Sequence, residues 1–219
     1  TLHRAATASR GDLVPRWLAP ADGRITVDAV AEALDDDATA LVVSHVDFRT
    51  GYRIDLAGMR ELIGPHRLLI VDAVQSFGVI DDDYAAADVV VGHAYKWMRA
   101  GRGTGFAWFA PRARERIVPL LSGRTGARGG LLPVDELPAA AASAQAFTMS
   151  APDTLAAGRL AAALRDVRDT GVATIESRLA DNVDRVLEIV DRAGIAVVSP
   201  RERGRRAGIV SLAPDDPAG

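Results

Sequence analysis

The chain has 219 residues, of which 48% are hydrophobic, enough for one large domain, or one and a half, with a substantial core. Its 26 basic and 29 acidic residues leave a net charge of −3, which gives no indication of a nucleic-acid or anionic-membrane partner. The lack of cysteine excludes disulfides, thiolate metal sites and cysteine nucleophiles from this stretch, and no metal site is predicted.

The sequence also lacks an apolar run as long as a membrane span and a recognisable signal peptide, so a cytoplasmic protein is expected. Its first residue is Thr1 rather than Met, and it ends on the loop-like run APDDPAG. We therefore expect this chain to be part of a longer protein.

The chain up to Pro65 predicts alternating helices and strands. Pro15 interrupts a short apolar piece, Thr26 is a plausible N-cap for the first periodic segment, and Gly64 ends the second. The elements expected are an edge strand at most at 13–18, a helix at 25–34, a buried strand at 40–44 and a helix at 55–63.

Two continuous apolar runs follow, at 68–71 and 89–91. Runs without polar alternation are typical of parallel strands that are covered on both faces. Together with the preceding elements they predict an open, mostly parallel α/β sheet in three layers, with right-handed crossovers.

Polar residues stand directly after both runs. Asp72 and Gln75 follow the first, and His93, Tyr95 and Lys96 follow the second. Ligands bind outside the carboxyl ends of strands in open α/β sheets, so these side chains are expected to face one crevice.

The strand at 40–44 is expected to bring Ser44 and the residues after it to the same edge. His45 fits a hydrogen-bonded support, and Asp47 and Arg49 either pair with each other or leave Arg49 to hold the strand end. His93 has two equally good interpretations: it orients a cofactor or transfers a proton, or it only supports neighbouring residues through hydrogen bonds. Trp97 is assigned to packing.

Lys96 is the only lysine in a chain whose other basic residues are all arginine. Arginine stays protonated in proteins, whereas a buried lysine can lose its proton and attack a carbonyl carbon. The position of Lys96 directly beyond a buried strand favours a chemical role over a surface lysine retained by chance.

A glycine-rich turn with Gly101, Gly103 and Gly105 follows Lys96, but its spacing does not fit a dinucleotide fingerprint, and a strand at 106–109 comes next. This turn is expected to let the backbone approach the site. A helix at 111–121 and a long loop at 122–138 follow.

From Pro152 the pattern changes to two amphipathic helices, the first ending at Gly171 and the second at Gly194. Short strands are expected at 195–198 and 209–212. We therefore divide the chain into a large domain, 1–150, whose N-terminal part is expected to lie outside this sequence, and connecting helices with the start of a small α+β C-terminal domain, 151–219.

A carboxylate such as that of Asp72, at the end of an apolar strand, needs a cation or several donors. A protonated pyridine nitrogen is one candidate, because at ~4 Å and an effective dielectric of ~20 the attraction is on the order of 4 kcal/mol. That would raise the pKa of the ring nitrogen by about three units. Gln75 can donate to a phenolic oxygen, and Lys96 can form a Schiff base, which are the protein groups that pyridoxal phosphate chemistry requires.

The ordered segments SHVDFRTG, VDAVQSFG and GHAYKW resemble the class V branch of the aspartate aminotransferase superfamily, the fold type I pyridoxal phosphate enzymes. The likeness covers roughly residues 25–170. The first segment and the Tyr before the Lys are more similar to kynureninase than to cysteine desulfurase, although kynureninases usually carry His where Gln75 stands.

This resemblance implies pyridoxal 5′-phosphate as cofactor, an aspartate aminotransferase-like large domain and a homodimer that builds its site between subunits. It implies that Lys96 is the Schiff-base lysine, Asp72 the pyridinium partner, Gln75 a contact to the phenolic oxygen and Tyr95 a phosphate contact. Thr125 and Ser150 are the remaining candidate cofactor contacts; Ser150 stands where the family usually has a threonine that reaches the neighbouring subunit's cofactor phosphate.

The sequence therefore predicts an enzyme that acts on an amino acid, either as an aminotransferase or as a kynureninase-like hydrolase or lyase. In this interpretation Lys96 is released by the substrate amine and then removes or relays the α-proton. The alternative is a catalytically inactive binding or dimerisation module with the same fold.

Overall fold

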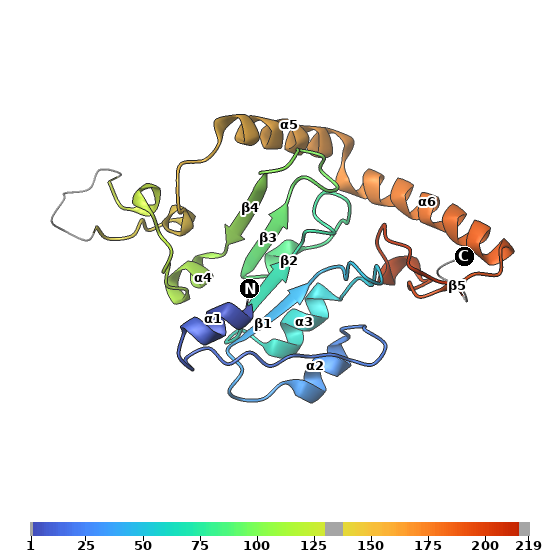
Figure 1. The fold of residues 1–219 in the computed structure, drawn as a ribbon, viewed down its shortest axis with the longest axis horizontal. Helices are drawn as coiled ribbons and strands as arrows, with labels where there is room; N and C mark the ends of the chain where they lie inside the picture. The colour runs from blue at the N-terminus through green and yellow to red at the C-terminus, as the bar shows by residue number, and fades with distance from the viewer. Residues whose placement is uncertain (1, 130–137, 215–219) are drawn as a thin grey trace.

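A computed structural model describes residues 2–129 and 138–214, and its centre is a four-stranded sheet (Figure 1). The strands lie in the order β1-β2-β3-β4; the first three are parallel and the fourth is antiparallel. Their bounds are β1 Ala40–Ser44, β2 Leu68–Asp72, β3 Val89–His93 and β4 Gly105–Phe109. The predicted open, mostly parallel α/β sheet is confirmed.

β4 turns back beside β3 because the glycine-rich run between them reverses the chain. Gly101 and Gly103 have φ angles of 84° and 80°, in the left-handed region that favours glycine. His93 at the end of β3 is paired with Gly105 at the start of β4. The expected tight turn is therefore a connection between antiparallel neighbours, and it holds Lys96 at one edge of the sheet.

Two capped helices precede the second strand. Helix α2 (Val27–Ala33) begins after Thr26, whose hydroxyl accepts a hydrogen bond from the Ala29 N–H, as its sequence predicts. Helix α3 (Leu56–Ile63) begins after Asp55, which caps Gly58 in the same way. A short helix α1 (Leu2–Ala8) was not predicted, and the expected edge strand at 13–18 is absent.

The main hydrophobic core lies on one face of the sheet, where α2 and α3 pack. Val43, Leu69, Val71 and Val90 from three strands contact Met59 and its neighbours in α3. The opposite face is only partly covered, by helix α4 (Pro111–Arg116). The expectation of a buried strand at 40–44 is wrong for one face of β1, because Val42 is 47% exposed.

Helix α4 is shorter than predicted. Its last turn ends at Arg116, and Ile117 takes an extended conformation, so the predicted continuation to 121 is not helical. Part of the expected loop at 122–138 lies outside the described residues. The remaining short elements are 3-10 helices η1 Tyr84–Ala86, η2 Arg124–Gly126, η3 Ala144–Phe147 and η4 Arg203–Arg205.

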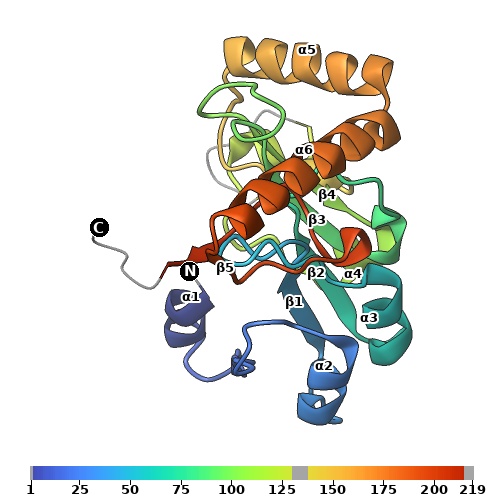
Figure 2. The ribbon, with the colours of Figure 1, turned by 90° about the vertical axis from the view of Figure 1, so that its right-hand side faces the viewer.

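Two long helices form the C-terminal part of the fold, α5 (Thr154–Thr170) and α6 (Val172–Arg192). Gly171, with a φ of 81°, joins them. Figure 2 shows α6 running from the end of α5 towards a small antiparallel sheet. That sheet consists of β5 (Ala196–Val197) and β6 (Leu212–Ala213), both close to the positions predicted for them. The boundary proposed at 150 stays a prediction.

Candidate active site

The carboxyl ends of β1, β2 and β3 lie side by side, which places the predicted site residues at one edge of the sheet. Ser44 is paired with Asp72, and Asp72 with Val91. The backbone continues this contact past the strands, since the Ala73 N–H donates to the Val91 carbonyl over 2.8 Å. The turn that follows Asp72 and the loop that follows His93 are therefore neighbours.

Asp72 is half-buried and has an incomplete set of partners. One of its carboxylate oxygens accepts a hydrogen bond from the Val74 N–H at 2.9 Å. No basic side chain of the described residues pairs with it, whereas the less exposed Asp88 pairs with both Arg60 and Arg112. A partly desolvated carboxylate without a counter-charge is suited to binding a cation. Gln75, also half-buried, lies in the turn that follows Asp72.

Lys96 is half-buried in the loop between β3 and β4, and no carboxylate of the described residues pairs with it. The loop itself is well anchored. Ala94 and Met98, on either side of Lys96, are buried against Leu160 and Ala163 of α5. The Arg159 side chain of α5 also donates hydrogen bonds to backbone carbonyls of this loop, so Lys96 lies on an ordered segment.

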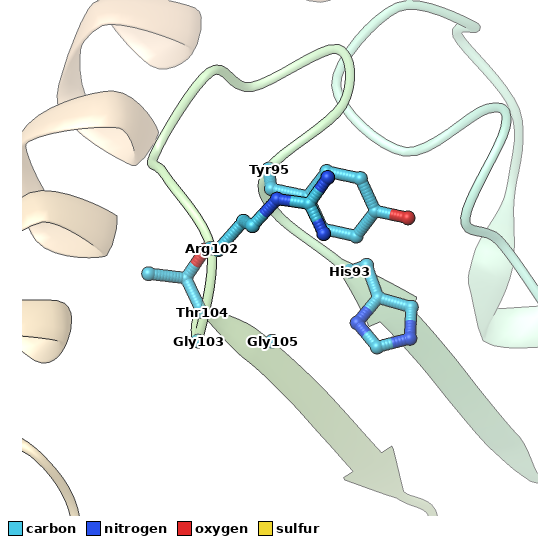
Figure 3. Close-up of a pocket in the computed structure, with 6 residues that line it drawn as sticks. All are labelled: His93, Tyr95, Arg102, Gly103, Thr104 and Gly105. Carbon is cyan, nitrogen blue, oxygen red and sulfur yellow. The ribbon is translucent and has the colours of Figure 1, made fainter.

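A cavity of about 370 Å³ lies beside this loop (Figure 3). His93 and Tyr95, two of the predicted cofactor residues, both line it, with ring centroids 5.5 Å apart. The other lining residues are Arg102, Gly103, Thr104 and Gly105. Asp72, Gln75 and Lys96 do not line this cavity, so the structure joins His93 with Tyr95 and places the other three at the adjoining strand ends.

His45 is not at the open edge where the sequence placed it, because its ring is fully buried on the core side. Its Nδ1 lies 2.9 Å from the Ser76 hydroxyl and 3.1 Å from the Tyr84 hydroxyl. Its Nε2 lies 3.0 Å from the Asp82 carboxylate and donates to it. The supporting role proposed for His45 fits this geometry.

This hydrogen-bonded cluster, formed by His45, Ser76, Asp82, Tyr84 and Arg53, holds both ends of the turn that carries Asp72 and Gln75. The His45 N–H donates to the Asp72 carbonyl at 2.9 Å, while the His45 ring contacts Ser76 at the other end of the turn. Sequence reasoning missed four members of this cluster, namely Arg53, Ser76, Asp82 and Tyr84.

The surroundings within the cluster shift the pKa values of Asp82 and Tyr84. Burial by itself would raise the pKa of Asp82, but hydrogen bonds from His45 and Arg53 outweigh it and hold that pKa well below its usual range. Burial raises the pKa of Tyr84 to about 12, so its hydroxyl stays protonated and donates to Ser76. The only sequence signal for this cluster is the acidic run before Tyr84.

Two further predicted details are resolved. Asp47 and Arg49 pair with each other at 2.6 Å, rather than leaving Arg49 to hold the strand end. Trp97 packs with Val46, Val79 and residues of α6, as assigned.

Thr125 and Ser150 lie away from the cavity. Thr125 is at most weakly bonded to the Thr148 carbonyl, at 3.5 Å, and the exposed Ser150 has only a similarly long contact to its neighbour Ala151. Neither lines the cavity in Figure 3. Their assignment to a cofactor stays a prediction, as do those of Asp72, Gln75, His93, Tyr95 and Lys96.

The fold is that of the pyridoxal phosphate aminotransferase-like α/β proteins. The chain superposes on the apo cysteine desulfurase of Thermococcus onnurineus with a TM-score of 0.84 at 21% identity, over 99% of this chain and 53% of that one. It superposes on the cystine C-S lyase C-DES, solved with cysteine persulfide, with a TM-score of 0.85 at 19% identity, over 99% and 59%. Another C-DES structure carries glycine covalently linked to its PLP cofactor and matches with a TM-score of 0.77 at 17% identity, over 88% and 51%.

Residues 5–216 match the family model for class V aminotransferases. The chain belongs to this family. A curated relative, the kynureninase of Deinococcus radiodurans, is 27% identical over 192 residues, which are 84% of this chain and 47% of the relative. The chain thus spans about half the length of the curated relatives it matches.

No helix in the described part of the chain is long and apolar enough to cross a bilayer.

Proposed function

We propose that this chain carries the Schiff-base lysine of a pyridoxal 5′-phosphate-dependent enzyme that acts on an amino acid. The observation that supports it most directly is the presence, at neighbouring strand ends, of two half-buried charged groups that lack a charged partner within the described part of the chain. Asp72 is a half-buried carboxylate without a basic partner among the described residues, and Lys96 is a half-buried amine without an acidic one. Removing a charge from water is costly unless it is paired or hydrogen-bonded, so both positions suit a ligand that completes them.

The residues present fit the cofactor. Asp72 would face the pyridinium nitrogen, Gln75 would donate to the phenolic oxygen, and His93 and Tyr95 would contact the cofactor from the cavity they line. When bound, pyridoxal phosphate withdraws electrons from the carbon attached to the substrate's amino group. A carboxylate at Asp72 favours the protonated form of the ring and so increases that withdrawal.

Lys96 has two roles in this proposal. Its amine would hold the cofactor through the aldehyde carbon, and once a substrate amine takes that place, the freed Lys96 amine would remove or relay the α-proton.

Within the family, the kynureninase-like relatives favour cleavage of a substrate carbon–carbon bond, and the family model favours amino-group transfer. We propose these two reactions as the alternatives for the whole enzyme, together with assembly as a homodimer. The other candidate is an inactive module with the same fold.

The test is to incubate the chain with pyridoxal phosphate, reduce it with borohydride and map the peptides. Because Lys96 is the only lysine, the sole competing amine is the chain terminus, and the expected result is a pyridoxyl group on the Lys96 peptide. Lys96→Ala and Lys96→Arg should both lose the visible absorbance of the bound cofactor. An unmodified Lys96 peptide in the unaltered chain, at saturating cofactor, would instead identify the inactive module.

A further inference from the structure

The cavity in Figure 3 is lined by a charged residue, Arg102, for which no role was predicted from the sequence. The Arg102 guanidinium lies over the ring of Tyr95, with its central carbon 5.7 Å from the ring centroid. Figure 3 shows the His93 ring on the same side of the loop. A guanidinium stacked on an aromatic ring is held in a defined orientation and still presents its N–H groups outwards.

The backbone that carries Arg102 is fixed by contacts from α5 and within the turn. The Arg159 side chain donates to the carbonyls of Ala100 and Arg102, at 3.1 and 3.3 Å. The hydroxyl of the buried Thr104 donates to the Gly101 carbonyl at 2.5 Å. Arg102 is therefore an exposed side chain on an anchored turn, rather than part of a loose loop.

The lining of the cavity is a set of donors without an acid. Arg102 supplies guanidinium N–H groups, Tyr95 a hydroxyl, and His93 a ring N–H. No carboxylate lines the cavity, and none in the described part of the chain pairs with Arg102. By contrast, the less exposed Arg53 is paired with both Asp82 and Glu176.

We propose that this cavity binds an oxyanion and that Arg102 is its principal ligand. A planar guanidinium forms paired hydrogen bonds to phosphate or carboxylate oxygens, and the hydroxyl of Tyr95 adds a third. Two sources carry this chemistry next to Lys96, the phosphate of the cofactor and a carboxylate of the substrate. The naming of those sources rests on the proposed function; the binding of an oxyanion does not.

The first experiment measures the oxyanion alone. Inorganic phosphate and acetate are titrated into the chain while the fluorescence and NMR signals of Tyr95 are followed, in the unaltered protein, in Arg102→Gln and in Arg99→Gln. Arg99 is an exposed arginine in the same loop that does not line the cavity, so it is the matched control. We expect Arg102→Gln to weaken binding of at least one anion roughly tenfold and Arg99→Gln to leave it unchanged.

The second experiment distinguishes the sources. If the ligand is the cofactor phosphate, Arg102→Gln weakens binding of pyridoxal phosphate roughly tenfold and leaves that of pyridoxal, which lacks the phosphate, unchanged. If the ligand is a substrate carboxylate, pyridoxal phosphate and pyridoxal both bind to Arg102→Gln as they do to the unaltered chain. The variant then binds an amino acid no more tightly than the corresponding amide, which lacks the carboxylate. Arg102→Lys should restore part of the binding in either case, since it keeps the charge but not the fork geometry.

The inference is overturned if Arg102→Gln matches the unaltered chain for inorganic phosphate and acetate. This result is distinct from failure of the proposed function, which would show as the absence of any Lys96 adduct with either aldehyde. Oxyanion binding that depends on Arg102 in a chain without such an adduct would support this inference and contradict the proposed enzyme.

Discussion

Asp72 and Asp82 are both half-buried aspartates near the carboxyl ends of the strands, but their surroundings differ. Asp82 receives hydrogen bonds from His45 and Arg53, whereas Asp72 receives one from its own turn. The first is satisfied by the protein itself and stabilises the fold. The second has capacity for a further cationic partner, which is the reason it belongs in the proposed site.

Replacing Asp82 with Asn should destabilise the chain in a pH-dependent way. The folded chain holds the pKa of Asp82 below the value of about 4 that it has when unfolded, so its contribution is complete above about pH 5 and is lost as the pH falls below 4. We expect Asp82→Asn to lower the free energy of unfolding by about 1–3 kcal/mol at pH 7, with a smaller difference at pH 3. Urea unfolding at both pH values measures this.

Asp166→Asn is the control, because Asp166 is exposed on α5 and its side chain has no ion pair among the described residues. Equal destabilisation by Asp82→Asn at pH 7 and pH 3 would show that the negative charge of Asp82, next to His45 and Arg53, does not contribute to the free energy of unfolding.

Among the elements, α6 is joined to the strand ends through the carboxylate of Glu176. Glu176, in its first turns, accepts a hydrogen bond from the Arg53 guanidinium and another from the Asp81 N–H, both at 2.8 Å. Arg53 also contacts Asp82, so this link continues into the cluster around His45. Apolar contacts of Ile175 and Leu179 with Val79 and Ile80 surround it.

Glu176→Gln should weaken this junction, since an amide keeps the oxygen for one donor but loses the charge that attracts Arg53. The expected loss in the free energy of unfolding is about 1 kcal/mol, with the unfolding of α6 followed by hydrogen exchange of its first turns. Glu188→Gln, on an exposed part of the same helix without an ion pair, should change neither quantity. Similar exchange rates in both variants would show that the apolar contacts alone hold α6.

Element boundaries were predictable where a local signal marks them. Thr26 and Asp55 cap their helices with side-chain oxygens, and Gly171 joins α5 to α6, so these limits follow from neighbouring residues. The end of α4 was mispredicted because apolar residues beyond Arg116 continue the periodic pattern without forming another turn. The hydrophobic pattern does not say which surface would bury such residues.

At the scale of the whole molecule, the sheet has one core face and one open face. Val43 points into the core and is 8% exposed, while its neighbour Val42 is 47% exposed on the other side. Val43→Ala should therefore lower the free energy of unfolding by about 1–3 kcal/mol, and Val42→Ala by less than about 0.5 kcal/mol. Chemical unfolding of the two variants measures the difference; equal effects would mean that the open face is covered in solution.

The candidate site was predictable in its residue types and their order, because buried strands end in polar groups at positions 72, 75, 93, 95 and 96, and the single lysine falls among them. The arrangement of these residues in space, in two separate groups, was not predictable. The structure gives His93 and Tyr95 a cavity with Arg102 and leaves Asp72 and Lys96 at the adjoining strand ends. The orientation of a side chain beyond a strand depends on how its loop packs, here against α5, and that contact joins residues far apart in the chain.

By itself, the sequence predicted the apolar runs of the parallel strands, the N-cap of α2, the two C-terminal helices and the lysine beyond β3, because each is marked by a pattern of residues close in the chain. Only the tertiary structure decided that β1 has an exposed face, that His45 turns into the core towards Ser76 and Asp82, and that Arg102 stacks on Tyr95. These features arise from contacts between separate segments, and the local periodicity of a sequence does not specify which segments meet.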